Sequence, residues 1–548
     1  MKVADFFCGG GGFSEGFREA GFDVVYAVDK WKPAVDTHHA NHPKCNTVNR
    51  DVEELSFLEC NKFNEEIPDT EILIGSPPCV AFSNSNKSGK ADKSLGIRLL
   101  EAYLRIVYRK LHKENSILKY WVLENVPNIE KYLKSSYTAE DLGINKSYDV
   151  PLDKVLIVKS VSSKIYNSKY YGVASSRRRY ICGDFPEPCR TIKDEKDIVP
   201  LKKILDNLMV PLENNNNKEN NNIMIKDFYN SFRMKRIEIT DHHYIQIIPQ
   251  FQWKKAKIAK IDKGYMGKMS FPENINKPAR TVMATMSFSS RESMIFAYGR
   301  NNYRAPTIRE VASAMSFPLD YKFYGSSLES KYRLVGNAVP PKMSFAIAKE
   351  IAKMENQKIP KYKPIHHDNQ VGEFRNFNFR EIIKKEEKRK SNKARYKYHI
   401  PYLIINTCRV ELTNHKSDFI KEKYIWDVEI HKGQGSKAQI FAPHIEDINK
   451  YLGADIICKL DKYIQDYYIR NLINMGYDEL QKNFQLPSNE IGNLICPDKI
   501  LYDIKKYIEA IMDDNNNNIL IDNKNQVPVI IIYGYYILSK LINKIGGR

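Results

Sequence analysis

The first third of the chain alternates short apolar runs with amphipathic stretches, and this alternation limits the fold more than any other feature. The runs VADFF, DVVYAV, EILIG, YWVLENV and RRRYICGDF all lie between Lys2 and Phe185. Strands that alternate with helices build a parallel sheet with helices on its faces. We therefore expect an α/β domain with a Rossmann-like sheet over residues 1–185.

The remainder of the chain predicts three further regions. The alternating pattern weakens over 186–298, and we expect a smaller domain there. Helical periodicity returns over 299–355, and we expect this segment to complete the first domain. A charged stretch from Glu381 to Lys397 precedes mixed strands and helices, so 356–548 is predicted to be an additional α+β C-terminal domain of unknown role. An Asn-rich patch near 214–222 indicates a disordered surface loop.

Charge and cysteine usage restrict the class of protein. Lys and Arg number 85 against 66 Asp and Glu, a net charge of +19 that favours polyanionic partners. The sequence lacks a secretory signal and a membrane-length apolar run, so we expect a cytoplasmic protein that binds no membrane. The nine cysteines form no CxxC pair, which argues against a zinc site, and we predict no metal.

A glycine-rich turn follows the first predicted strand. VADFF runs into CGGGGFSEGF, where free backbone N–H groups and missing Cβ atoms allow a ligand to come close. The dinucleotide fingerprint G-x-G-x-x-G fails at Ser14. Asp29 could accept hydrogen bonds from a ribose diol, Trp31 could stack on a purine, and Asp51 could reach an adenine amino group. These residues predict a pocket for an adenosine-containing cofactor.

A cysteine, an acid and two arginines are candidates for chemistry. Cys79 follows an apolar strand and two prolines, and its thiol needs activation because its ordinary pKa is about 8.5. Glu124 ends the neighbouring predicted strand, so both side chains should meet at one sheet edge. Arg177 and Arg179 are two residues apart and share a face that suits a carbonyl or phosphate oxygen. Taken singly, the cysteine also fits an inert packed thiol, the glutamate a solvated carboxylate, and the arginines a solvated basic surface.

An ordered set of motifs over about Met1–Met354 resembles the DNA cytosine-5 methyltransferase family. In chain order, the motifs are DFFCGGGGF, Asp29, Asp51, SPPC, ENV, RRR and RLVGNAVPP. The resemblance implies a Rossmann-like S-adenosylmethionine-dependent methyltransferase sheet, a smaller target-recognition domain and an enzyme of a restriction-modification system. It assigns S-adenosylmethionine binding to Asp5, Phe7, Gly9, Gly11, Gly12, Asp29, Trp31, Asp51, Pro77 and Asn337. The sequence departs from the family pattern at Asp29, Ser175 and Val80.

The resemblance also implies a reaction. The Cys79 thiolate would add to C6 of cytosine and make C5 nucleophilic toward the methyl group of the cofactor. Glu124 would contact the ring N3 and the exocyclic amine, while Arg177 and Arg179 would hold O2 and nearby phosphate. Because C6 lies inside the base stack, the target cytosine must flip out of the duplex.

Double-stranded DNA is therefore the expected partner of a monomeric enzyme, with a cognate restriction endonuclease in the same system. The predicted DNA contacts are Ser83, Arg233, Lys235, Arg236, Lys254, Lys255, Arg280, Thr281 and Arg291. Alternatives are an RNA cytosine-5 methyltransferase, a non-catalytic DNA-binding protein and a fusion with a nuclease. The last rests on Glu411, Asp427, Glu429 and Lys432 in two predicted strands, although alternating acids usually mark a solvated strand face.

Overall fold

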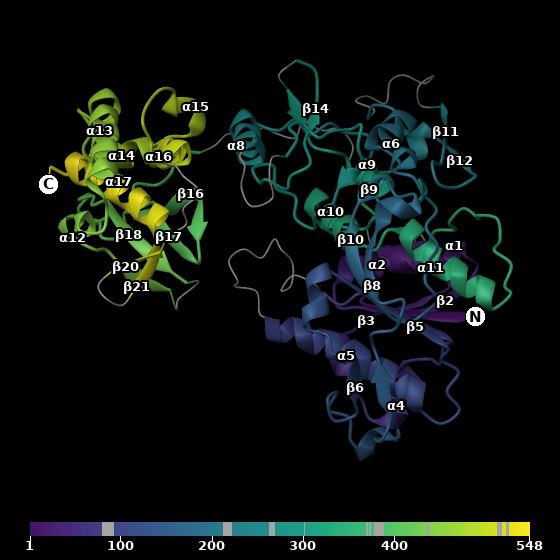
Figure 1. The fold of residues 1–548 in the computed structure, drawn as a ribbon. Coiled ribbons are helices and arrows are strands. Elements are labelled where there is room, and N and C mark those ends of the chain that lie inside the picture. The colour runs from purple at the N-terminus through teal and green to yellow at the C-terminus, as the bar shows by residue number, and fades with distance from the viewer. Residues whose placement is uncertain are drawn as a thin grey trace. The chain divides into compact units, whose positions relative to one another are not determined.

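The computed structural model describes most of the chain, namely residues 1–78, 93–211, 222–261, 269–300, 302–368, 371, 374–376, 388–433, 438–511, 518–521 and 525–547. Cys79, Ser83 and all but the last residue of the predicted Asn-rich loop lie outside these ranges. The chain divides into two compact units, the first over Met1–Asp262 and Lys268–Lys384, the second over Lys385–Arg548 (Figure 1).

A seven-stranded sheet lies at the centre of the first unit, in the order β3-β2-β1-β4-β5-β10-β8. Its strands are β1 (Lys2–Phe6), β2 (Asp23–Asp29), β3 (Asn46–Asn49), β4 (Ile72–Gly75), β5 (Tyr120–Asn125), β8 (Lys164–Asn167) and β10 (Arg178–Asp184). All five runs predicted as strands are strands. The first five strands of the order pair in parallel, as in a Rossmann-like sheet.

The sheet is not wholly parallel, however, because β10 runs antiparallel to both β5 and β8. A parallel crossover needs a dozen or more residues and usually a helix. Only residues 168–177 join β8 to β10, so the strand turns back. This reversal places the start of β10 beside the end of β5, where Tyr180 pairs with Asn125.

Helices cover both faces of this sheet (Figure 1). Val3, Ile74 and Val122 pack with α1 (Gly12–Glu19) and α11 (Pro341–Met354). The alternate residues of the same strands pack on the opposite face, against α3 (Val52–Ser56), α4 (Cys60–Glu66) and α5 (Lys93–His112). Since both faces are buried, the strands read as continuous apolar runs. The helix α2 (Lys32–Asn41) connects β2 to β3.

Shorter elements complete the first unit. Its helices are α6 (Leu201–Leu208), α8 (Gln250–Ile261), α9 (Ile308–Ala314) and α10 (Leu328–Asn337), with 3₁₀ turns at 127–131, 146–148, 168–171, 195–197 and 236–238. Its short strands are β6 (Ser136–Thr138), β7 (Val155–Ile157), β9 (Ser175–Ser176), β11 (Met224–Lys226), β12 (Arg233–Lys235), β13 (Ala279–Arg280), β14 (Phe296–Ala297) and β15 (Tyr303–Arg304). Residues 356–376, assigned from the sequence to the C-terminal domain, belong to this unit.

The second unit has its own core. Four antiparallel strands, β16 (Lys397–Ile405), β17 (Cys408–Thr413), β18 (Asp427–Lys432) and β19 (Gln439–Phe441), form its sheet, and β20 (Asn518–Ile521) pairs with β21 (Asn525–Pro528). Its helices are α12 (Ile445–Asn449), α13 (Ala454–Asn471), α14 (Tyr477–Gln485), α15 (Ser488–Ile491), α16 (Pro497–Ile511) and α17 (Val529–Ile545). The two predicted strands that carry Glu411, Asp427, Glu429 and Lys432 are present as β17 and β18. Within the ranges described above, no helix has the length and apolar character needed to cross a bilayer.

Candidate active site

The glycine-rich turn lies at the carboxyl end of β1, between β2 and β4. The connection from β1 leads to β2 on one side, whereas the connection from β4 leads to β5 on the other side, and such a switch point is where open α/β sheets bind ligands. Asp29, at the end of β2, closes the turn: its Oδ2 accepts the Gly9 N–H at 3.0 Å and its Oδ1 accepts the Trp31 N–H at 2.8 Å. Burial raises the pKa of this carboxyl group.

The glycines of the turn have different roles. A Cβ at Gly12 would lie 2.1 Å from the Val339 carbonyl oxygen, and one at Gly11 would lie 2.2 Å from the Tyr321 hydroxyl. The missing Cβ atoms at these two positions therefore leave room for Tyr321 and Val339 of the same chain. The sequence predicted instead that a ligand would approach there. At Gly9, with φ +53°, the sole neighbour of an added Cβ within 4 Å is the Phe7 carbonyl oxygen among the described atoms. Gly9 is thus the glycine with an open side.

Asp5 supports the turn from beneath. It is fully buried, and its Oδ2 accepts the Ser14 hydroxyl at 2.6 Å, while Ser14 Oγ lies 2.9 Å from His38 Nε2. Burial raises the pKa of Asp5 to about 7 and lowers that of His38 to about 3. In the described part of the structure Asp5 Oδ1 has no hydrogen-bond partner. Asp5 thus braces the helix that follows the turn.

Trp31 and Asp51 follow the carboxyl ends of β2 and β3, on the same edge of the sheet as the glycine-rich turn. The Arg333 guanidinium lies 4.7 Å from the centre of the half-buried Trp31 ring. Asp51 caps α3 by accepting the Glu53 N–H at 2.9 Å and pairs with Lys30 at 2.6 Å. Both residues have protein partners, and their contact with a cofactor remains a prediction.

Glu124 is buried at the end of β5, where two groups contact its carboxylate. The Ser76 hydroxyl donates to Oε2 at 2.6 Å, and Arg179 Nε lies 2.9 Å from Oε1. The Arg179 contact is an ion pair with poor hydrogen-bond alignment, since Oε1 accepts no hydrogen bond from the described residues. The side chain of Glu124 is 4% exposed, so its charge is compensated by Arg179 at short range.

Arg177 lies beside this pair, as its spacing from Arg179 predicts. Glu124, Arg177 and Arg179 line one small pocket together with Tyr166, Ser168 and Pro340. Arg177 donates to the carbonyl oxygens of Val282 and Asn337, at 3.3 Å each. The Asn337 side chain is exposed, so its main chain is what the arginine holds. The pocket therefore combines an acid with two cations at one sheet edge.

Pro77 lies at the same edge of the sheet. Its carbonyl oxygen accepts the Asn125 side-chain amide at 3.1 Å, and β4 and β5 are neighbours as predicted. Cys79 itself follows two residues later and lies outside the described residues. Ser76, which the sequence prediction missed, stands directly before the two prolines, and its contact with Glu124 could not be read from that position.

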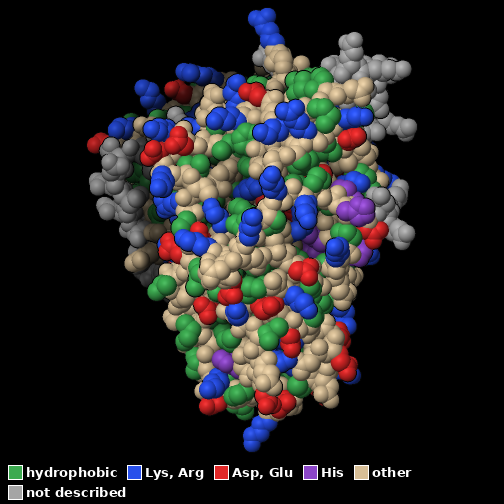
Figure 2. All heavy atoms as spheres, turned by 90° about the vertical axis from the view of Figure 1, so that its right-hand side faces the viewer, with side chains coloured by type: hydrophobic (Ala, Val, Ile, Leu, Met, Phe, Trp, Pro, Cys, Tyr) green, Lys and Arg blue, Asp and Glu red, His purple; other side chains and the backbone are tan. Residues whose placement is uncertain are grey.

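The predicted DNA contacts divide into exposed and buried groups. Arg233, Lys235, Lys254 and Lys255 are exposed, and Figure 2 shows Lys and Arg side chains gathered on the upper half of one face. Arg236 and Arg291 are buried and donate to the carbonyl oxygens of Val210 and Ala259. These bonds and the burial give both side chains a packing role within the protein, and their contact with DNA stays a prediction.

Arg280 and Thr281 also have partners within the protein. Arg280 pairs with Glu273 at 2.7 Å, and Thr281 donates to the Ser176 carbonyl oxygen at 2.9 Å. Both side chains are half-buried. They join the segment around Glu273 to β9, the strand that precedes the arginine pair, and their contribution to DNA binding stays a prediction.

Comparison with known proteins is consistent with this geometry. The sequence matches the C-5 cytosine-specific DNA methylase family over residues 1–353. The chain belongs to this family. It is accordingly a DNA cytosine-5 methyltransferase, and the resemblance drawn from its motifs is confirmed.

Several relatives resemble the chain over the same portion. The type II methyltransferase M.MthTI of Methanothermobacter thermautotrophicus is 28% identical, across 64% of this chain and 97% of its own. M.FnuDI of Fusobacterium nucleatum is 27% identical, across 64% and 94%. Among solved structures, the S. pombe Dnmt2 methyltransferase has 15% identity and a TM-score of 0.41, and the match covers 65% of this chain and 99% of that one.

The acids of the second unit differ from their prediction. Glu411 and Glu429 face each other on β17 and β18, and both are buried, so the expected solvated face is wrong. His431 Nε2 lies 3.3 Å from Glu411 and 2.9 Å from Glu429, and Arg409 pairs with Glu411 at 2.6 Å. Basic neighbours thus compensate the acids. Over the ranges that the structure covers, no group of three or more His, Cys, Asp or Glu side chains could hold a metal ion.

Proposed function

We propose that this chain methylates C5 of cytosine in double-stranded DNA through a covalent adduct between Cys79 and C6. The observation that most supports this is the small pocket lined by β5, β8, β10 and residues 339–343, where Glu124 is buried against Arg179, while Asn125 beside Glu124 binds the Pro77 carbonyl oxygen. A planar polar ring fits such a site, because a carboxylate can face N3 and the exocyclic amine while a guanidinium faces O2.

The chain's residues then divide the reaction. The Cys79 thiol loses its proton and its sulfur forms a bond to C6, which raises electron density at C5. Glu124 stabilises the proton at N3 during this shift, and Arg177 and Arg179 stabilise charge on O2. Once C5 has formed its bond to the methyl group, loss of the C5 proton and cleavage of the sulfur–C6 bond restore the aromatic ring and release Cys79 as a thiolate.

The glycine-rich turn at the end of β1, together with Asp29, suits S-adenosylmethionine. Gly9 has an open side, and each Asp29 oxygen keeps a lone pair after accepting one backbone N–H, so the carboxylate can accept a ribose hydroxyl. Phe7, Trp31, Asp51, Pro77 and Asn337 complete the proposed site, while Asp5, Gly11 and Gly12 support it from within. When bound, this cofactor supplies an electrophilic methyl group.

The substrate has to leave the base stack, because attack at C6 comes from outside the ring plane. Exposed Arg233, Lys235, Lys254 and Lys255 suit contacts with the phosphate backbone, which position the enzyme without reading sequence. Since its relatives are named type II methyltransferases, we place the protein in a restriction-modification system, acting as a monomer beside a cognate endonuclease.

The test is transfer of labelled methyl from S-adenosylmethionine to unmethylated mixed-sequence DNA, followed by single-base mapping. Wild-type protein should label cytosines in a short recurring sequence, Cys79→Ala should label none, and Cys189→Ala, at an exposed cysteine, should match wild type. DNA carrying 5-fluorocytosine should trap a covalent complex with Cys79, because fluorine at C5 prevents loss of a proton. Label in RNA instead of DNA would overturn the proposed substrate.

A further inference from the structure

Residues 356–376, here named the strap, follow α11 and are bound along the first unit. Gln357 donates to the Gly21 carbonyl oxygen at 3.0 Å, the Ile365 N–H to Asp320 at 2.7 Å, and the Asp368 N–H to the Ala40 carbonyl oxygen at 3.1 Å. The family match ends at residue 353. The strap is therefore integrated into a methyltransferase domain whose family pattern does not include it.

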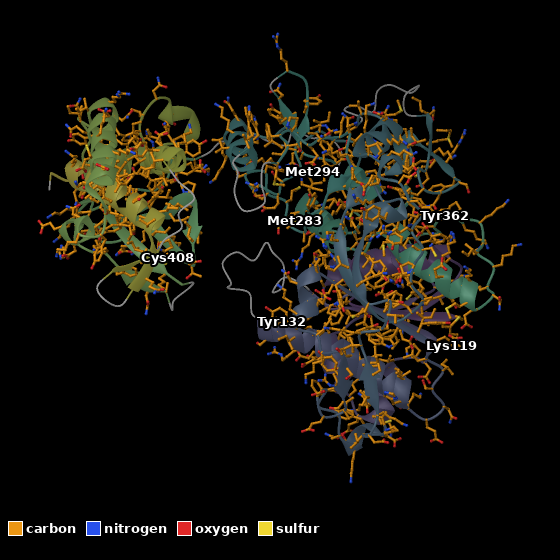
Figure 3. The ribbon with its side chains drawn as sticks, viewed as in Figure 1. Lys119, Tyr132, Met283, Met294, Tyr362 and Cys408 are labelled. Atoms are coloured by element: carbon orange, nitrogen blue, oxygen red, sulfur yellow. The ribbon has the colours of Figure 1, made fainter. Side chains whose placement is uncertain are left out.

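Tyr362, labelled in Figure 3, is the strap residue that contacts two distant parts of the unit. Its ring stacks on Phe232, with centroids 5.1 Å apart and planes at 15°, and the Arg18 guanidinium lies 5.0 Å from its centroid. Its hydroxyl donates to Asp320 at 3.1 Å. Arg18 belongs to α1, the helix after the glycine turn, whereas Phe232 directly precedes Arg233 of β12.

A polar contact supports the same junction from the other side. Lys342 of α11 lies 2.6 Å from Glu19 of α1 and 2.8 Å from the side-chain oxygen of Asn230. Asn230 in turn donates to Glu19 at 3.2 Å. The loop that leads into β12 is thus held on α1 by hydrogen bonds at Asn230, and it is held on the strap by ring stacking between Phe232 and Tyr362.

We propose that Tyr362 is a positioning residue: it fixes the segment carrying Arg233 and Lys235 relative to α1, and thereby sets the affinity for DNA. This rests on the proposed function, because it takes those two side chains to be phosphate contacts. Without the Tyr362 ring, the segment would populate several positions, and apparent affinity falls with the fraction that is competent to bind. The strap thus links α1, the helix after the glycine turn, to the segment that would contact DNA.

The test uses the full chain with Tyr362→Ala, Tyr362→Phe and a matched control, Lys361→Ala, at an exposed strap position. Tyr362→Ala should raise KM for DNA about fivefold, with kcat and S-adenosylmethionine affinity within about twofold of wild type. Tyr362→Phe keeps both ring contacts and should restore KM. Phe232→Leu, which removes the stacking partner, should reproduce the rise in KM.

Hydrogen–deuterium exchange gives a readout that needs no substrate. Exchange over residues 224–235 should increase in Tyr362→Ala and Phe232→Leu, while β5 stays protected. Unchanged exchange and unchanged KM in Tyr362→Ala would overturn the proposal, as would equal effects in Lys361→Ala. If wild-type protein failed to methylate DNA, the proposed function would fall, whereas the exchange data would still decide whether Tyr362 positions this segment.

Discussion

The guanidinium of Arg179 lies 2.9 Å from the carboxylate of Glu124 because β10 runs antiparallel to β5. The reversal brings the first residues of one strand to the last residues of the other. A parallel β10 would carry Arg179 to the opposite edge of the sheet. The direction of β10 therefore brings Glu124 and Arg179 together. Glu124 also contacts Ser76, three residues before Cys79.

Glu124→Gln tests the acid in this pair. The amide keeps the size of the side chain and can still accept the Ser76 hydroxyl, but it carries no charge. We expect kcat to fall by about 10²–10⁴-fold, measured by methyl transfer at saturating DNA. Glu130→Gln, at an exposed position on the following turn, should leave kcat unchanged. Equal activity in the two variants would remove Glu124 from the reaction.

Gly9→Ala and Gly12→Ala separate ligand approach from packing. Alanine at position 12 meets a backbone carbonyl oxygen at 2.1 Å, so we expect a loss of stability of about 3 kcal/mol in denaturant unfolding. Alanine at position 9 costs about 1–2 kcal/mol, because φ is positive there. For each kcal/mol of stability lost, Gly9→Ala should nevertheless weaken S-adenosylmethionine binding more than Gly12→Ala does. The reverse ranking would contradict the open side assigned to Gly9.

Asp5 predicts a dependence of stability on pH. The unfolded chain loses this proton near pH 3.8, whereas the folded chain keeps it to about pH 7 because burial raises the pKa. Stability contributed at Asp5 should therefore fall between about pH 4 and pH 7, by a total on the order of 4 kcal/mol. Asp5→Asn removes this term, so the stability of the variant relative to wild type should increase from pH 5 to pH 8. A constant difference across that range would refute the assignment.

Lys331 and Asp241 form a fully buried ion pair, with Nζ 2.8 Å from each carboxylate oxygen. The strap completes it, since Lys331 donates to the Arg375 carbonyl oxygen and Asn376 accepts the Asp241 N–H. Asp241→Asn leaves a buried ammonium without its carboxylate and should cost about 3–5 kcal/mol. Adding Lys331→Met should recover much of that loss. Calorimetry of the three proteins measures both effects.

Salt dependence tests the exposed lysines of α8. If Lys254 and Lys255 each neutralise one phosphate, the double alanine variant should lower the slope of log affinity against log salt by about 1.8. Lys202→Ala, on α6 and paired with Asp206 at 2.9 Å, is the matched control and should leave the slope as in wild type. An unchanged slope in the double variant would show that α8 does not contact the DNA backbone.

Much of the first unit could be predicted because its information is local. The apolar runs are strands, and Glu124, Arg177 and Arg179 line one pocket, because strand ends and side-chain alternation follow from position along the chain. The direction of β10 could not be predicted in this way, since it depends on how short its connection to β8 is. The glycine-rich turn follows the first strand as predicted, but the atom nearest to an added Cβ at Gly11 or Gly12 belongs to a residue more than 300 positions away.

Basic residues of the region 186–298 show the same limit. Arg236 and Lys235 are adjacent in sequence, yet Arg236 is buried while Lys235 is exposed. Composition predicts a positive surface there and cannot decide which side chains reach it. Glu411 and Glu429 were expected in solvent, because the sequence does not show that β17 and β18 pair these acids face to face and bring His431 within reach of both.

The strap also bears on how a protein of this architecture can be assembled from parts. A gene fusion joined directly after α11 would separate Tyr362 and Asn376 from the partners they contact, so the domain could not be exchanged there without loss. A junction between the strap and β16 would leave both hydrophobic cores complete. The place at which the second unit can be gained or lost is therefore some 20 residues beyond the end of the shared family sequence.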